Sequence, residues 1–145
     1  MPIITPTDLE ACLYPEVIAE VTRDENALTE RAIATAEQEA KMYLGRYDLT
    51  ALFGTESAAP TVNDAYLKSI VQHLACWHLL RLSNTGVDYG VLRTAYQDAV
   101  SALKTIMTGQ AQPDGWPYAD VQGGEVPADG NSINWSSNPR RNHFY

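Results

Sequence analysis

The segment from Leu67 to Leu82 constrains the fold most strongly, because its second half is apolar nearly all round a helix. A helix that is hydrophobic on all sides is stable in the middle of a protein rather than at its surface. The rest of the chain must therefore supply other helices that surround it. The apolar positions of the segment are Leu67, Ile70, Val71, Leu74, Ala75, Cys76, Trp77, Leu79, Leu80 and Leu82.

The segment from Thr22 to Tyr47 predicts a long amphipathic helix. Its first residues, Thr22 to Glu25, match a capping box, in which a hydroxyl precedes a glutamate by three residues. Apolar residues then recur at three- and four-residue steps, whereas Glu37 and Glu39 are expected to lie off this stripe. Many stripe positions are alanines, which let a second helix approach closely. The stripe consists of Leu28, Ala32, Ile33, Ala36, Ala40, Tyr43, Leu44 and Tyr47.

A further amphipathic helix is predicted from about Gly90 to Thr108, and Gly109 stands where it should stop. Thr61 to Asp64 offer a capping signature for the central helix, and a loop is expected from Asp48 to about Pro60. No segment shows sustained apolar–polar alternation. The predicted class is therefore mainly α: a small helical bundle with two long antiparallel helices plus shorter helices.

A short helix is predicted near the start of the sequence, with Thr7 placed as its N-cap. Tyr14-Pro15 should interrupt it, because the residue before a proline is disfavoured in the helical region. The first residues contain no basic stretch followed by a long apolar one, so we expect no signal peptide. The longest apolar run of the chain is far short of the ~20 residues that a membrane span requires, so we expect no span.

The composition is that of a single soluble domain with an acidic surface. The chain has 145 residues, of which 45% are hydrophobic, and a formal net charge of -8. This balance argues against a surface that grips nucleic acid or an anionic membrane, because phosphate binding needs cationic patches. Cys12 and Cys76 are too few for a disulfide scaffold, and both are expected to be reduced.

The composition changes after Gly109, where Gly, Pro and small polar residues dominate. We therefore expect a domain at residues 1–109 and an extended, partly disordered arm at 110–145. Solvated linkers rarely carry so many aromatic residues, so the arm is predicted to order against another surface; the alternative is that it folds back on its own bundle. Its candidate protein-interaction residues are Trp116, Tyr118, Trp135, Arg140, Arg141, Phe144 and Tyr145.

The sequence offers little that resembles an active site. His73 and Cys76 lie three residues apart on one helix face, but His78 lies well round the helix, and no further cluster completes a tetrahedral metal site. Glu37 and Glu39 do not share a helix face. None of the familiar nucleophile, phosphate-binding or metalloprotease motifs is present. We therefore expect no enzymatic activity, no cofactor and no metal.

Four stretches, taken in order, resemble the Mu-like phage head-to-tail connector family. Ile3 to Leu9 is similar to its extended start before an Asp-Leu helix, and Lys41 to Tyr47 is similar to its Tyr-Leu pair followed by Arg-Tyr. Ile70 to Leu80 occupies the place of its apolar helix, and Tyr96 to Gly109 that of its closing helix. The resemblance covers roughly residues 3–109.

The chain departs from the family pattern at two places. Leu74-Ala75-Cys76-Trp77 replaces an Ile-Ala-Arg-Tyr-like string, and Asp48-Leu49-Thr50 stands where a proline often follows the Arg-Tyr motif. The arm is also longer than the family leads one to expect. These departures leave the fold assignment intact and affect mainly the partner of the arm.

The resemblance implies a structural protein of a phage or prophage virion, a head-completion or adaptor protein made in the bacterial cytoplasm. Copies would form a ring, twelve-fold when assembled, beneath the portal protein and next to a tail-completion or stopper protein. DNA would only pass through the channel, which a net negative charge suits, because cationic walls would hold phosphates. The family motif implies core roles for Tyr43, Leu44, Arg46 and Tyr47.

Other functions fit the same residues. A tail-completion or tail-terminator protein also forms rings but is usually richer in β structure. A small α-helical binding module from outside phages would use its arm to capture a partner. A small helical hydrolase with dispersed site residues is the third alternative.

Overall fold

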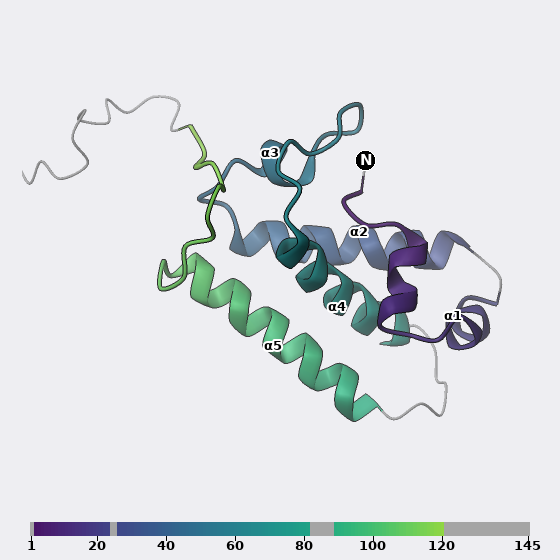
Figure 1. The fold of residues 1–145 in the computed structure, drawn as a ribbon. Helices are drawn as coiled ribbons and strands as arrows, with labels where there is room; N and C mark the ends of the chain where they lie inside the picture. The colour runs from purple at the N-terminus through teal and green to yellow at the C-terminus, as the bar shows by residue number, and fades with distance from the viewer. Residues whose placement is uncertain (1, 24–25, 82–88, 121–145) are drawn as a thin grey trace, which may run out of the picture.

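The computed structural model describes residues 2–23, 26–81 and 89–120, which form helices joined by turns (Figure 1). Within these residues there is no strand, and the one isolated β-bridge pairs Tyr47 with Tyr118. The predicted mainly α class is confirmed. In chain order the elements are the 3-10 helix η1 (Pro6–Ala11), α1 (Pro15–Thr22), α2 (Asn26–Tyr43), α3 (Leu49–Phe53), α4 (Ala65–Arg81) and α5 (Tyr89–Met107).

Helix α4 is the centre of the fold, as its apolar sequence predicts. It packs against both α2 and α5, crossing α2 obliquely and running antiparallel to α5 (Figure 1). Fully burying one such leucine or isoleucine stabilises the folded state by about 1.5–3 kcal/mol. Eight of its side chains are buried: Leu67, Ile70, Val71, Leu74, Ala75, Cys76, Leu79 and Leu80.

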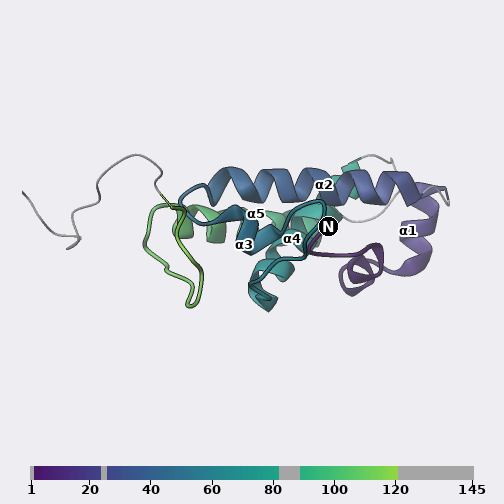
Figure 2. The same ribbon diagram turned by 90° about the horizontal axis from the view of Figure 1, so that it is seen from above.

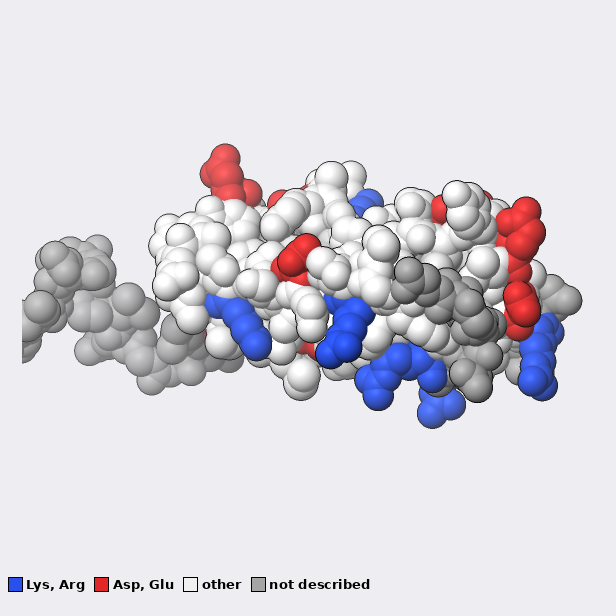
Figure 3. Space-filling model, turned by 90° about the horizontal axis from the view of Figure 1, so that it is seen from below, with Lys and Arg blue, Asp and Glu red and all other residues white. Residues whose placement is uncertain are grey.

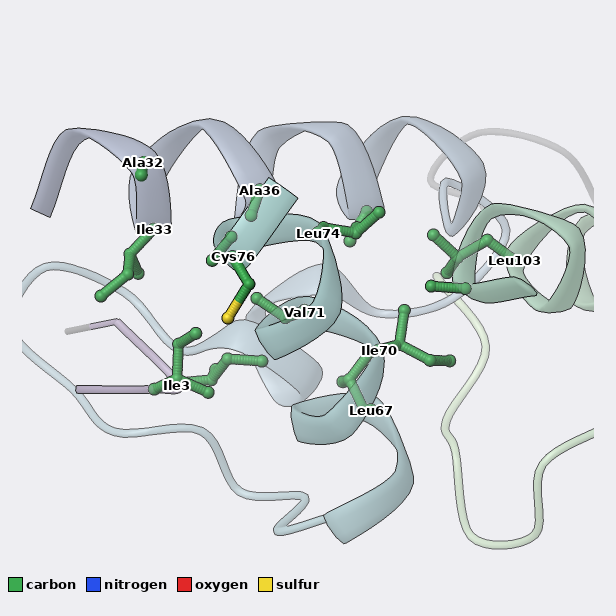
Figure 4. Close-up of a cluster of buried hydrophobic side chains, with 14 of the residues drawn as sticks. Ile3, Ala32, Ile33, Ala36, Leu67, Ile70, Val71, Leu74, Cys76 and Leu103 are labelled. Atoms are coloured by element: carbon green, nitrogen blue, oxygen red, sulfur yellow. The ribbon is translucent and has the colours of Figure 1, made fainter. Parts of the chain in front are cut away.

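The alanines of α2 allow α4 to approach closely. Ala32 and Ala36 turn toward α4, where Val71 and Leu74 project into the same cluster (Figure 4). A small side chain at the contact shortens the distance between two helix axes. The predicted stripe thus forms the α2 side of the core, but the helix ends at Tyr43, earlier than the stripe suggests.

The N-terminal segment is part of the core. Ile3 and Ile4 are buried beside α2, and the backbone N–H of Ile3 donates to Glu37 Oε1 at 2.7 Å. The expectation that Glu37 lies off the buried stripe is therefore wrong: its side chain reaches the N-terminal segment and accepts a bond there. The N-cap of η1 is Thr5 rather than Thr7, because Thr5 and Asp8 form a reciprocal capping box.

The boundary between α1 and α2 also differs from the prediction. Thr22 closes α1, and its hydroxyl donates to the carbonyl of Ile18 at 2.8 Å, so Thr22 is not the cap of α2. Arg23 follows with a left-handed φ of 49°. The predicted interruption at Tyr14-Pro15 is confirmed, since α1 begins at Pro15, the favoured place for a proline in a helix.

The expected loop after Asp48 contains the one-turn helix α3. Asp48 caps it by accepting from the backbone N–H groups of Thr50 and Ala51. The Thr50 hydroxyl and the Ala51 N–H both favour the charged carboxylate and lower the pKa of Asp48. The short helix buries Leu52 and Phe53 against the rest of the core, which a pattern of so few residues could not predict.

The remaining boundaries agree with the sequence. Within the capping signature at residues 61–64, Asp64 is the residue that accepts from the first backbone N–H groups of α4, those of Tyr66 and Leu67. Helix α5 ends at Met107, and Gly109 adopts a φ of 78° just after it. None of the described helices has both the length and the apolar character that crossing a membrane requires.

Candidate functional site

The family-like motif forms the turn that ends α2. Leu44 is fully buried and Tyr47 is 2% exposed, while Tyr43 packs against the edge of the same core. The N–H of Tyr47 donates to the carbonyl of Leu44 at 2.9 Å, which closes the turn. Arg46 is exposed.

This turn holds the segment that follows α5. The N–H of Asp48 donates to the carbonyl of Pro117 at 2.9 Å, and the N–H of Ala119 donates to the carbonyl of Arg46 at 3.1 Å. Two backbone hydrogen bonds in opposite directions make a short antiparallel bridge. Residues 117–119 are thereby fixed to the C-terminal end of α2.

Three aromatic rings meet at this bridge. Trp116 packs edge-on against Tyr47 with ring centroids 5.4 Å apart, and Tyr118 stacks on the Tyr47 ring with centroids 5.2 Å apart. The guanidinium carbon of Arg46 lies 5.7 Å from the Tyr118 ring centroid, within the range of a cation–π contact. We call Arg46, Tyr47, Trp116 and Tyr118 the aromatic anchor.

A hydrogen bond connects the anchor to the start of α4. The indole Nε1 of Trp116 donates to Asp64 Oδ2 at 2.7 Å. Partial burial of Asp64 alone would raise its pKa, but the indole and the N–H groups of Leu67 and Tyr66 outweigh that effect, so the pKa is lowered. Asp64, the last residue of the predicted capping signature, therefore caps α4 and holds Trp116.

The predicted interaction residues separate into three groups. Trp116 is 5% exposed and packs in the core of its own chain, so it is not available to a partner. Tyr118 is 54% exposed and does face solvent. Trp135, Arg140, Arg141, Phe144 and Tyr145 lie outside the described residues.

The contacts of Trp116 also move the expected boundary at residue 109. Residues 110–120 pack against the bundle, with Ala111 and Trp116 in contact with the core. For this part of the chain, folding back on the bundle is the correct alternative. The non-helical segment after α5 is therefore attached to the bundle through Ala111, Trp116 and residues 117–119.

A groove of about 720 Å³ lies between the N-terminal segment, α2 and the loop after α3. Its apolar lining includes Ile4, Ile33 and Phe53, and its polar lining includes glutamates and Lys41. The Lys41 Nζ lies 5.1 Å from the centroid of the Phe53 ring. The groove combines residues from segments about 50 positions apart, so no local sequence motif predicts it.

A polar cluster joins three helices on another side of the bundle. Glu39 of α2 accepts from the Tyr96 hydroxyl at 2.8 Å and lies 2.6 Å from His78 Nε2. Trp77 stacks on Tyr96 with centroids 5.5 Å apart. Burial of Tyr96, with the hydrogen bond and the charge of Glu39, raises its pKa to about 12. The cluster ties α2, α4 and α5 together.

A smaller hollow of about 330 Å³ lies beside this cluster, with Arg31 and Arg81 among its lining residues. On the underside of the molecule, Lys and Arg side chains follow one long edge, while most Asp and Glu side chains in that view lie away from it (Figure 3). The acidic net charge is therefore not spread evenly over the described surface.

The two cysteines, 64 positions apart, meet where η1 packs on α4. Both are free thiols, and Cys76 is buried while Cys12 is partly exposed. The hydrogen bond between them lowers the pKa of Cys12 and, together with burial, raises that of Cys76. Cys76 Sγ also lies 3.9 Å from the carbonyl oxygen of Leu9.

Within residues 2–23, 26–81 and 89–120, no group of three His, Cys, Asp or Glu side chains could hold a metal ion. His78, one of the metal candidates from the sequence, pairs with Glu39 instead. No family model matches the chain, and searches of curated proteins and of solved structures found no match.

Proposed function

We propose that the chain is a head-to-tail connector of a phage or prophage virion. Copies form a ring, twelve-fold by the family resemblance, beneath the portal protein and above a tail-completion or stopper protein. The ring joins the capsid to the tail, and DNA passes through its channel.

The aromatic anchor is the observation that carries this proposal. It attaches residues 117–119 to the turn after α2, so the last described part of the chain is held at this turn. The turn itself is the family-like Leu44-Gly45-Arg46-Tyr47 motif. An arm that binds a neighbouring subunit loses less conformational entropy when the residues from which it starts are already held in place. Its affinity for the neighbour is then higher.

Two other family-like stretches have matching roles in the fold. Ile3, Ile4 and Leu9 are buried, and Thr5 and Asp8 form the capping box at the start of η1. The stretch from Ile70 to Leu80 is the central helix. These roles support the resemblance because each motif corresponds to a distinct part of the core.

The experiment that tests the proposal is a mass measurement in solution, with and without the portal protein. We expect ring-sized assemblies, either of the chain alone or on addition of portal rings. The truncated variant should stop after Asp120 rather than after Gly109, because Trp116 belongs to the core. This variant should remain folded and lose assembly.

A chain that stays monomeric with both portal and tail proteins would count against the connector. Binding to a single protein unrelated to virions would favour the non-phage binding module. A ring that binds the end of tail tubes and does not bind the portal protein would favour the tail-terminator alternative.

A further inference from the structure

The groove beside α2 has an apolar floor and an acidic rim. The N-terminal segment and α3 lie on the same side of α2, which leaves the groove between them (Figure 2). Glu30 and Glu56 are exposed on its rim, and the carboxylate of Glu37 lies deeper. Lys41 is the cation of the lining, and its ammonium group lies over the Phe53 ring. The groove therefore suits a ligand that carries positive charge next to apolar or aromatic groups.

The chain itself contains such a ligand. Arg140 and Arg141 are its only adjacent arginines, and Phe144 and Tyr145 follow within four residues. Guanidinium groups make paired hydrogen bonds to carboxylates, and aromatic rings bury large apolar areas. We propose that residues 131–145 of one copy bind in the α2 groove of a second copy, which rests on the proposed function.

The length of the arm and the position of its root fit a contact between copies. The root is fixed at the end of α2, and the 20 residues from Asp120 to Arg140 span up to about 70 Å when extended. The arm and the groove are different surfaces of one chain. Contacts between unlike surfaces of identical subunits are the kind that close into rings.

Peptide binding tests the groove. A fluorescein-labelled peptide of residues 131–145 is titrated into the full chain carrying R140E and R141E. This variant has an unchanged groove, and its own arm lacks the two arginines that would bind the groove. Fluorescence anisotropy at low ionic strength should show saturable binding. Adding E30K and E56K should weaken it at least tenfold, because both carboxylates lie on the rim.

The matched control is E16K with E20K, which makes the same change in charge on α1, outside the groove. It should leave peptide binding within twofold. Glu37 is kept, because its carboxylate holds the N–H of Ile3. Circular dichroism checks that each variant stays helical. Absent binding, or an equal loss in the control, would overturn the proposal.

A mixing experiment identifies the copy that is bound. The variant R140E/R141E has an unchanged groove that can still bind an arm. The variant E30K/E56K has an unchanged arm that can still bind a groove. Their mixture should form a one-to-one heterodimer in native mass spectrometry, while each variant alone stays monomeric. Peptide binding without a heterodimer would mean that the arm occupies its own groove, which also overturns the proposal.

The two proposals fail in different ways. If wild type forms rings on the portal and the groove variants do so equally well, the connector stands and the arm contact is wrong. If wild type never forms rings on the portal, the connector fails, whatever the peptide result.

Discussion

At the scale of single residues, Tyr47 combines burial with an unused polar group. Its side chain is 2% exposed, and its hydroxyl has no hydrogen-bond partner among the residues that the structure describes. A buried hydroxyl without a partner loses its bonds to water and gains nothing in return. The ring, by contrast, packs against both Trp116 and Tyr118.

We therefore predict that Y47F leaves the free energy of unfolding unchanged or raises it by up to about 1 kcal/mol. Y47A, which also removes the ring, should lower it by about 3–5 kcal/mol. Urea denaturation measures both values. A loss above about 1 kcal/mol for Y47F would show that the hydroxyl has a partner elsewhere in the full chain.

The bond between Trp116 and Asp64 gives a second prediction. W116F keeps most of the packing and removes the indole donor, so it should lower the free energy of unfolding by about 1–2 kcal/mol. In the D64N background, which replaces the charged acceptor, the same substitution should cost less. A double-mutant cycle measures this coupling, and additive effects would contradict the bond.

Acid should weaken the fold through its capping aspartates. The carboxylates of Asp8, Asp48 and Asp64 all have a pKa below the ordinary value of 3.8, because hydroxyl, indole or backbone donors favour their charged forms. Their contribution is complete above pH 3.8 and is lost as the pH falls through the lowered folded values. Urea midpoints between pH 7 and pH 2.5 measure the loss, which should be smaller in D64N.

At the scale of elements, α3 depends on the glycine that ends it. Gly54 has a φ of 73°, and an added Cβ would lie 2.5 Å from the carbonyl oxygen of Ala58. Backbone surrounds the position, so the strain cannot be relieved by moving a flexible side chain. The loop after α3 also contributes Glu56 to the groove, so the geometry of this turn shapes the groove.

We predict that G54A lowers the free energy of unfolding by about 1–3 kcal/mol, the range for backbone strain in sparsely populated conformations. G45A is the matched control, because an added Cβ there meets nothing within 4 Å. It should change stability by less than about 0.5 kcal/mol. Thermal unfolding compares the two, and equal effects would contradict the turn geometry.

At the scale of the whole molecule, the core formed by the described residues extends along the chain as far as Trp116. Within residues 2–23, 26–81 and 89–120, the other core residues come from the N-terminal segment and all the long helices. Truncation after Asp120 should therefore keep the thermal midpoint within a few degrees, whereas truncation after Gly109 should lower it clearly. Circular dichroism melts measure both; a large loss in the longer variant would place part of the core beyond residue 120.

The sequence by itself determined the helical class and the central position of α4. A helix that is apolar nearly all round can only be buried, and the three- and four-residue stripes of its neighbours are local patterns that one segment reveals. Turn chemistry that acts over a few residues was predictable for the same reason, as at Tyr14-Pro15 and Gly109.

Only the tertiary structure decided which distant side chains meet. Trp116 reaches Asp64 across 52 positions, Glu37 reaches Ile3 across 34, and Glu39 meets His78 and Tyr96 from separate helices. Glu37 and Trp116 look like surface residues in the sequence, because a local pattern cannot show a partner that arrives from another part of the chain. Packing set these contacts, since a buried polar atom is stabilised by a hydrogen bond, and at these positions only a distant segment supplies the partner.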